Sequence, residues 1–262
     1  GNFAGKTPTL GATSQTATYT FKNWNNAAAG NGSYTYTNGQ TVTNPNGATS
    51  GTTYLYAQWN SASVKLPTAT LPGYTFLGWY DAATGGNKIG GAGDSYTPTA
   101  AKTLYAHWSA NAITVKFSGN GATSGSMTDQ VFTYDTAQAL KANGFSRAYT
   151  VTYNGNFAGK TPTLGATSQT ATYTFKNWNN AAAGNGSYTY TNGQTVTNPN
   201  GATSGTTYLY AQWNSASVKL PTATLPGYTF LGWYDAATGG NKIGGAGDSY
   251  TPTAAKTLYA HW

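Results

Sequence analysis

The motif that comes nearest to a chemical site is Gly-Lys-Thr, the ending of many phosphate-binding loops, which occurs at residues 5–7 and again at 159–161. Such a loop needs four residues between its first glycine and the Gly-Lys pair, and a helix directly after it. Only three residues separate Gly155 from Gly159, and Pro162 follows. We therefore expect a turn after a strand here, not a nucleotide site.

Other residue types that support catalysis or bind metals are sparse. The sequence has no cysteine, two histidines and six acidic residues, all of them aspartates without local pairing. His107 and His261 have no second histidine or acid at metal-ligand spacing, and Gln58 takes the corresponding place in a related segment. Neither a carboxylate pair for glycoside cleavage nor an oxygen-rich calcium cage is indicated. We predict no catalytic residue, no metal site and no cofactor.

The composition favours a folded β protein. Of 262 residues, 7% are charged and 15% are aromatic, which is unlike a disordered chain and typical of strands. The net charge of +7 comes from lysines spread singly along the sequence, whereas phosphate binding needs them clustered. No apolar run approaches the roughly 20 residues of a membrane-spanning helix. We expect neither nucleic-acid binding nor a membrane span in this segment.

An internal repeat dominates the sequence. Residues 1–108 and 155–262 are identical at every position, with an offset of 154. A second, unchanged copy seldom helps an enzyme, whereas stalks, fibres and multivalent binders gain length or valency from it. The repeat therefore favours a structural or binding role.

Each copy contains two related segments, in which Y-T-F-x-x-W is followed by L-Y-A-x-W. Strands of the type T-V-x-F/Y occur at 113–117 and 149–153. We take the recurring aromatic and leucine positions as a structural signature: Phe21, Trp24, Leu55, Trp59, Phe76, Trp79, Leu104, Trp108, Phe175, Trp178, Leu209, Trp213, Phe230, Trp233, Leu258 and Trp262.

These motifs resemble a known family. The segments GYTFLGWYDAATGG at 73–86, TLYAHW at 103–108 and ITVKFSGNGATSG at 113–125 are similar to the internalin B-repeat, also called the Listeria–Bacteroides repeat. The resemblance implies an extracellular bacterial surface protein, attached to the cell wall, in which small β-grasp-like modules form a repetitive stalk. Two features depart from the pattern: YTFKNW replaces YTFxGW in one segment of each copy, and no YTFxGW lies between the strands at 113–117 and 149–153.

Alternation predicts which strand faces form the core. Val151 and Tyr153 share one face of their strand, and Leu55, Ala57 and Trp59 share one face of theirs, which we expect to be buried. Strict alternation would place Phe76 and Trp79 on opposite faces. A bulge at Gly78 would turn the tryptophan inward; Asn23 holds that position in the related segment and tolerates left-handed geometry.

One segment, residues 136–143, has the pattern of a short helix, with Asp135 or Thr136 as its cap and Gly144 as its end. We predict a mainly β fold of tandem β-grasp-like modules in an elongated array, with at most this one short helix per 154-residue repeat. The predicted modules are 1–59, which is truncated at its N-terminus, 60–108, 109–213 with the helix, and 214–262.

Exposed tyrosines leave the function open. Tyr34 and Tyr36, repeated as Tyr188 and Tyr190, lie beside polar residues and are candidate glycan contacts, although outward tyrosines also support sheets. Our hypothesis is a non-catalytic stalk or spacer of an extracellular surface protein, with neighbouring repeats as its partners. The alternatives are a multivalent array that binds host or matrix carbohydrate or protein, and a filament subunit that self-associates by strand exchange at an open edge near the N-terminus.

Overall fold

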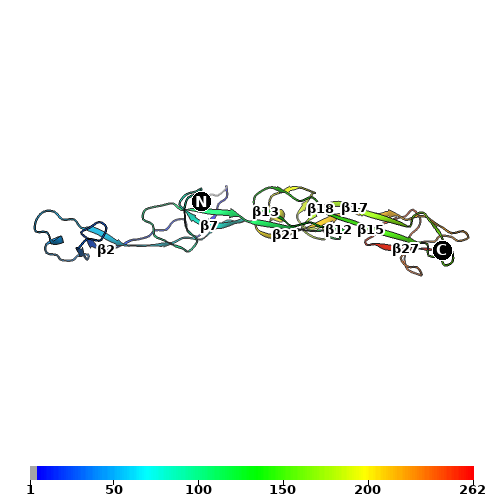
Figure 1. Cartoon of the computed structure of the whole chain (residues 1–262), viewed down its shortest axis with the longest axis horizontal. Helices are drawn as coiled ribbons and strands as arrows, with labels where there is room; N and C mark the ends of the chain where they lie inside the picture. The colour runs from blue at the N-terminus through cyan, green and yellow to red at the C-terminus, as the bar shows by residue number, and fades with distance from the viewer. Residues whose placement is uncertain (1–4) are drawn as a thin grey trace. The chain divides into compact units, whose positions relative to one another are not determined.

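The structure is a computed structural model that describes residues 5–262. Strands account for nearly all of its regular structure, and the helical residues described form two 3-10 turns, η1 (Pro45–Gly47) and η2 (Pro199–Gly201). The mainly β prediction is confirmed. The chain divides into two compact units, residues 1–110 (unit 1) and 111–262 (unit 2), which we describe separately (Figure 1).

Unit 2 contains a five-stranded sheet, sheet A. Its two central strands, β11 and β21, run parallel, and all other neighbours are antiparallel. Ile113 and Val115 of β11 and Leu209 and Ala211 of β21 are fully buried, so the alternating apolar residues form its core. The strands, in spatial order, are β13 (Gln130–Thr133), β11 (Ala112–Ser118), β21 (Gly205–Trp213), β18 (Phe175–Asn179) and β19 (Thr189–Tyr190).

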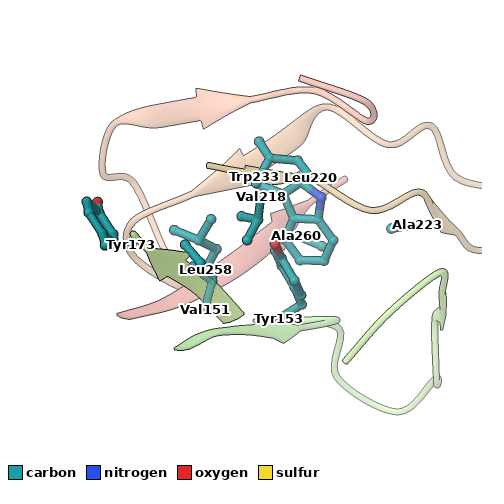
Figure 2. Close-up of a cluster of buried hydrophobic side chains, with 10 residues drawn as sticks. Val151, Tyr153, Tyr173, Val218, Leu220, Ala223, Trp233, Leu258 and Ala260 are labelled. Atoms are coloured by element: carbon teal, nitrogen blue, oxygen red, sulfur yellow. The ribbon is translucent and has the colours of Figure 1, made fainter. Parts of the chain in front are cut away.

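A second sheet of unit 2, sheet B, repeats this plan. Its parallel central pair is β15 and β27, and β17 pairs with β15 on the side away from β27. Figure 2 shows Val151 and Tyr153 of β15 pointing into the same cluster as Trp233 and Leu258. The strands are β12 (Ser124–Gly125), β15 (Phe145–Asn154), β17 (Ser168–Tyr173), β27 (Lys256–His261), β24 (Gly232–Tyr234) and β25 (Lys242–Gly244).

The two sheets are interleaved along the chain. The chain forms β11 and β13 of sheet A, then β15 and β17 of sheet B, then returns for β18, β19 and β21 before completing sheet B. Strand pairing therefore crosses residue 213, the predicted boundary between the third and fourth modules. The four sequential modules stay a prediction. Trp213 packs against both cores and joins them.

The predicted helix at 136–143 is wrong. Gln138–Ala139 form strand β14, which pairs antiparallel with β20 (Thr195–Val196). Asp135 has a φ of 59°, which turns the chain before β14, and Leu140 is buried at 3% exposure. A lone helix of two turns is marginal in water, so burial of Leu140 and strand pairing override the local preference. Short antiparallel pairs elsewhere in unit 2 are β16 (Thr163–Leu164) with β23 (Ala223–Thr224), and β22 (Val218–Lys219) with β26 (Ser249–Tyr250).

Unit 1 forms smaller sheets from the same sequence. One contains, in spatial order, β3, β2 and β4, and the other contains β10, β7 and β8. The strands are β2 (Thr20–Asn25), β3 (Thr35–Tyr36), β4 (Tyr56–Asn60), β7 (Tyr74–Tyr80), β8 (Lys88–Gly90) and β10 (Tyr105–Ala110). Two short pairs join β1 (Thr9–Leu10) to β6 (Ala69–Thr70) and β5 (Val64–Lys65) to β9 (Ser95–Tyr96).

The predicted bulge in the Y-T-F-x-x-W strand is confirmed. Pairing of β7 with β10 skips Leu77, so Phe76 and Trp79 reach the same side, with ring centroids 5.6 Å apart. Gly78 has a φ of 136°, a conformation that residues with a side chain rarely adopt. The bulge in β2 skips Lys22, and there Asn23 has no positive φ, so the left-handed geometry considered for it does not occur.

Candidate functional site

The histidines belong to the scaffold of the strand bulge. The ring of His107 stacks on Tyr80, with centroids 3.9 Å apart, and its Nε2 lies 2.9 Å from the carbonyl oxygen of Ala82. His261 repeats both contacts with Tyr234 and Ala236. In the related segment Gln58 donates through Nε2 to the carbonyls of residues 27 and 28, at 3.4 and 3.3 Å. The imidazole and the amide thus contact corresponding loops of the two related segments. Among the residues described, no three histidines or acids gather as metal ligands.

The aspartates close turns. The Asp81 carboxylate accepts the backbone N–H of Asn87 at 2.7 Å, and this bond is the main reason why the pKa of Asp81 is lowered. Lys102 lies 3.8 Å from the same carboxylate. Asp235 repeats the arrangement with Asn241 and Lys256, and its pKa is lowered for the same reason. These carboxylates serve turn geometry.

The Gly-Lys-Thr motif lies in a turn. Residues 159–161 lie between β15 and β16, and Gly159 has a φ of 75°. The Nζ atom of Lys160 lies 4.8 Å from the ring centroid of Tyr228. The motif is followed by strand β16 and not by the helix that a phosphate-binding loop needs, as predicted. The copy at 5–7 also precedes a strand, and the residues before it lie outside the described part of the chain.

The four candidate glycan tyrosines flank the 3-10 turns. Tyr34 and Tyr36 stack with ring centroids 6.5 Å apart, and Tyr188 and Tyr190 do so at 6.4 Å. The hydroxyl of Tyr36 accepts the backbone N–H of Asn46 at 2.6 Å, and that of Tyr190 accepts the N–H of Asn200 at 2.7 Å. The outer rings of both pairs are exposed. Their glycan role stays a prediction.

The sixteen signature residues differ in burial between the copies. Trp178, Trp233, Leu209 and Leu258 of unit 2 are fully buried, while Leu55 and Trp59 of unit 1 are 37% and 56% exposed. The predicted burial of the Leu55 and Trp59 face is therefore wrong in unit 1, because β4 pairs with β2 alone among the described strands, whereas β21 lies between β11 and β18. Trp79 and Trp108 are also buried. The half-buried members are Phe21, Trp24, Phe76, Leu104, Phe175, Trp213, Phe230 and Trp262.

Unit 1 also contains a groove. The sequence predicted an open strand edge near the N-terminus, but not a groove or its lining residues. The groove has a volume of about 840 Å³ and is bordered on one side by residues 12–19 and on the other by 98–106. Leu66 and Trp79 form part of its apolar floor. In unit 2 the corresponding residues belong to β17 and β27, and β15 lies between them. The exact repeat was the available signal for the groove. Residues 12–19 and 98–106 recur in unit 2, and only there does the strand at 145–154 lie between their counterparts.

This arrangement of strands and signature residues agrees with a family comparison. The family model described as "Listeria-Bacteroides repeat domain" matches residues 41–107 and 198–261, which together make up half of the chain. The chain belongs to the Listeria-Bacteroides repeat family. Each matched range contains one 3-10 turn and ends one residue before the tryptophan of the second L-Y-A-x-W motif, and the resemblance seen in the motifs is confirmed.

A curated relative is similar to part of the chain. Internalin H of Listeria monocytogenes serovar 1/2a (strain EGD-e) is 46% identical over 72 residues, which are 27% of this chain and 12% of that relative. No solved structure matches the chain. Within the described residues, no helix is long and apolar enough to cross a membrane.

Proposed function

We propose that the chain is a non-catalytic stalk or spacer segment of an extracellular bacterial surface protein attached to the cell wall. The exact repeat supports this most directly, because two unchanged copies add length and add no new chemistry. Membership of the Listeria-Bacteroides repeat family and the similarity to Internalin H support a surface location.

The contacts of the polar residues support a non-catalytic role. Both histidines, Asp81 and Asp235 are engaged in loop and turn contacts that recur in each copy. A general acid or base must lie within hydrogen-bond reach of the substrate. A nucleophile needs a base beside it. Each histidine instead contacts a backbone carbonyl of a neighbouring loop, and each aspartate accepts a backbone N–H group of its own turn.

Strand interleaving gives unit 2 a physical reason to resist extension. Sheets A and B each take strands from separate stretches of chain, and Trp213 packs against both cores, so the two sheets support each other. The order of sheet A, with parallel strands at its centre, supports a β-grasp-like description of the module. Neighbouring repeats are then the main partners of each module.

Solution scattering tests the stalk proposal. A compact protein of 262 residues has a radius of gyration of about 18 Å. We expect a clearly larger value and a distance distribution with a long tail. A radius near the compact value would contradict the stalk role.

A second candidate function is a multivalent glycan-binding array. It is favoured by the exposure of Tyr34 and Tyr188, at 41% and 40%, on identical surfaces of the two copies. A glycan array tests it, with the double variant Tyr34→Ala, Tyr188→Ala as the control. Signals that the double variant loses would support binding, and a blank array at high protein concentration would exclude it.

A further inference from the structure

The same sequence surrounds a strand in unit 2 and a groove in unit 1. In unit 2, β15 pairs antiparallel with β17 over Arg147–Thr152 and parallel with β27 over Val151–Asn154. Subtracting the repeat offset of 154 places these flanks at residues 14–19 and 102–107. Both stretches border the groove of unit 1.

The backbone on both sides of the groove is less regular than its counterpart. β27 begins at Lys256, but β10 begins at Tyr105, so residues 102–104 lie outside every described strand. β17 covers 168–173, while 14–19 form no strand. In unit 2 the N–H of Tyr153 donates to the carbonyl of Thr167 at 2.9 Å. A strand that enters the groove would meet the corresponding backbone N–H and carbonyl groups of residues 14–19 and 102–104. It would pair with them and so extend β10, as in strand addition to a sheet edge.

The side chains at the groove match those that receive β15. The ring of Tyr153 lies 4.9 Å from that of Trp233, and its hydroxyl donates to Oε1 of Gln169 at 3.0 Å (Figure 2 shows the Tyr153–Trp233 pair). The counterparts of Trp233 and Gln169 are Trp79 and Gln15, and both line the groove. Leu258 is fully buried beside β15, whereas its counterpart Leu104 is half-buried.

We propose that this groove is an acceptor site for an extended strand of the β15 type, supplied as a separate copy of the Phe145–Asn154 segment. The strand lies parallel to β10, with its valine and second tyrosine facing Leu104 and Trp79. A volume of about 840 Å³ is within the usual range of ligand pockets. The inference is independent of the stalk proposal, because it concerns one sheet edge and not the shape of the chain.

Disulfide trapping reads the location, direction and register of the bound strand. Thr152 is the parallel partner of Thr257 in unit 2, so its partner in unit 1 would be Thr103. The probe is a synthetic peptide with the sequence of residues 145–154 and the substitution Thr152→Cys. It is added to the full chain carrying Thr103→Cys, which then has a single thiol because the sequence lacks cysteine. Neighbouring strands bring such pairs within disulfide distance.

The matched chain control carries Thr257→Cys, where β15 already occupies the site. We expect capture of the peptide, seen as one added peptide mass per chain, to be at least tenfold faster for Thr103→Cys than for Thr257→Cys. Rates are normalised to the reaction of each thiol with a small reagent.

The matched peptide control keeps the cysteine and adds Val151→Asp and Tyr153→Asp, which charges the face that should be buried. We expect this peptide to lose capture by Thr103→Cys, and this comparison needs no change in the fold of the chain. Equal capture of both peptides, or equal capture by both chains, would overturn the proposal. So would the absence of any capture of the Thr152→Cys peptide by the chain carrying Thr103→Cys.

Discussion

Units 1 and 2 contain an identical stretch of 108 residues in different surroundings. Residues 205–209 belong to strand β21 beside β11, while residues 51–55 form no strand. Trp178 is fully buried between Phe117 and Phe175, at 5.0 Å from each ring centroid, whereas Trp24 is half-buried. The region 111–154 therefore decides how much of the repeated sequence is regular and buried.

Some features do not differ between the copies. Asn25 and Asn179 are both 2% exposed, and each accepts the N–H groups of the same loop at 2.8 and 3.0 Å. The bulge glycines, Gly78 and Gly232, have φ values of 136° and 137°. Local features are thus set by the repeated residues themselves, and features that need a distant strand are not. In each prediction below, unfolding in urea is monitored by the fluorescence of a probe attached to a single cysteine. The cysteine is introduced into unit 1 in one experiment and into unit 2 in another.

The largest expected difference comes from one tryptophan in each copy. Trp178→Ala should lower the free energy of unfolding of unit 2 by about 4 kcal/mol, because it opens a cavity in a closed core. Trp24→Ala should lower that of unit 1 by only about 1–2 kcal/mol, because a half-buried ring loses less apolar contact. Equal losses in the two units would contradict the difference in burial.

High pH should weaken unit 2 through a residue that unit 1 does not share. Burial raises the pKa of Tyr153 to about 12, above its ordinary value of 10.0. The folded state therefore favours the protonated phenol, and its contribution is complete below pH 10 and is lost as the pH rises towards 12. The loss should reach about 2–3 kcal/mol. Tyr153→Phe should remove this part of the pH dependence, and an unchanged profile would show that Tyr153 is not buried.

The bulge glycines should behave alike in both units. A Cβ at Gly78 would lie 2.8 Å from the carbonyl oxygen of Gly90, and one at Gly232 would lie 2.9 Å from that of Gly244. Either Gly→Ala change should therefore lower the free energy of unfolding of its unit by about 1–3 kcal/mol. A cost confined to one copy would mean that the bulge depends on distant strands. Gly85→Ala is a suitable control, since its φ is also positive and its Cβ would meet nothing within 4 Å.

The smallest effect is expected at the exposed ion pairs. Lys102→Ala and Lys256→Ala each remove a contact of 3.8 Å to an aspartate. Exposed pairs of this kind contribute little to stability, so both variants should unfold almost as the parent does. A larger loss in unit 2 alone would indicate that Lys256 acts through the strand pairing of β27.

The sequence predicts local features better than their partners. Alternation placed Val151 and Tyr153 on one face, which is buried, because a two-residue period needs no knowledge of the neighbouring strand. The same rule failed at Leu55 and Trp59, which are exposed, because burial of that face depends on a distant strand. The bulge was predictable from Gly78 and the misplaced tryptophan. The interleaving of the two sheets was not, because it depends on which distant strand lies beside β21 or β27. The helix prediction at 136–143 failed for the same reason, since β20 and the burial of Leu140 lie outside the local pattern.

The candidate sites also divide into local features, which the sequence predicts, and features that depend on a distant strand, which it does not. Gln58 stands at the place of His107, and each side chain bonds to the corresponding loop of its own segment. The groove of unit 1 has no motif of its own. Its residues recur in unit 2 on both sides of β15. Only the strand pairing of unit 2 shows that they can hold a strand between them.

Backbone amide exchange at one pair of residues tests the central claim, that strands from 111–154 complete the repeated sequence. Leu258 lies in the parallel ladder beside Tyr153, while Leu104, with the same neighbours in sequence, lies outside every described strand. With segmental isotope labelling to separate the copies by NMR, we predict that the amide of Leu258 exchanges at least a hundredfold more slowly than that of Leu104. Equal exchange rates at the two positions would contradict the account.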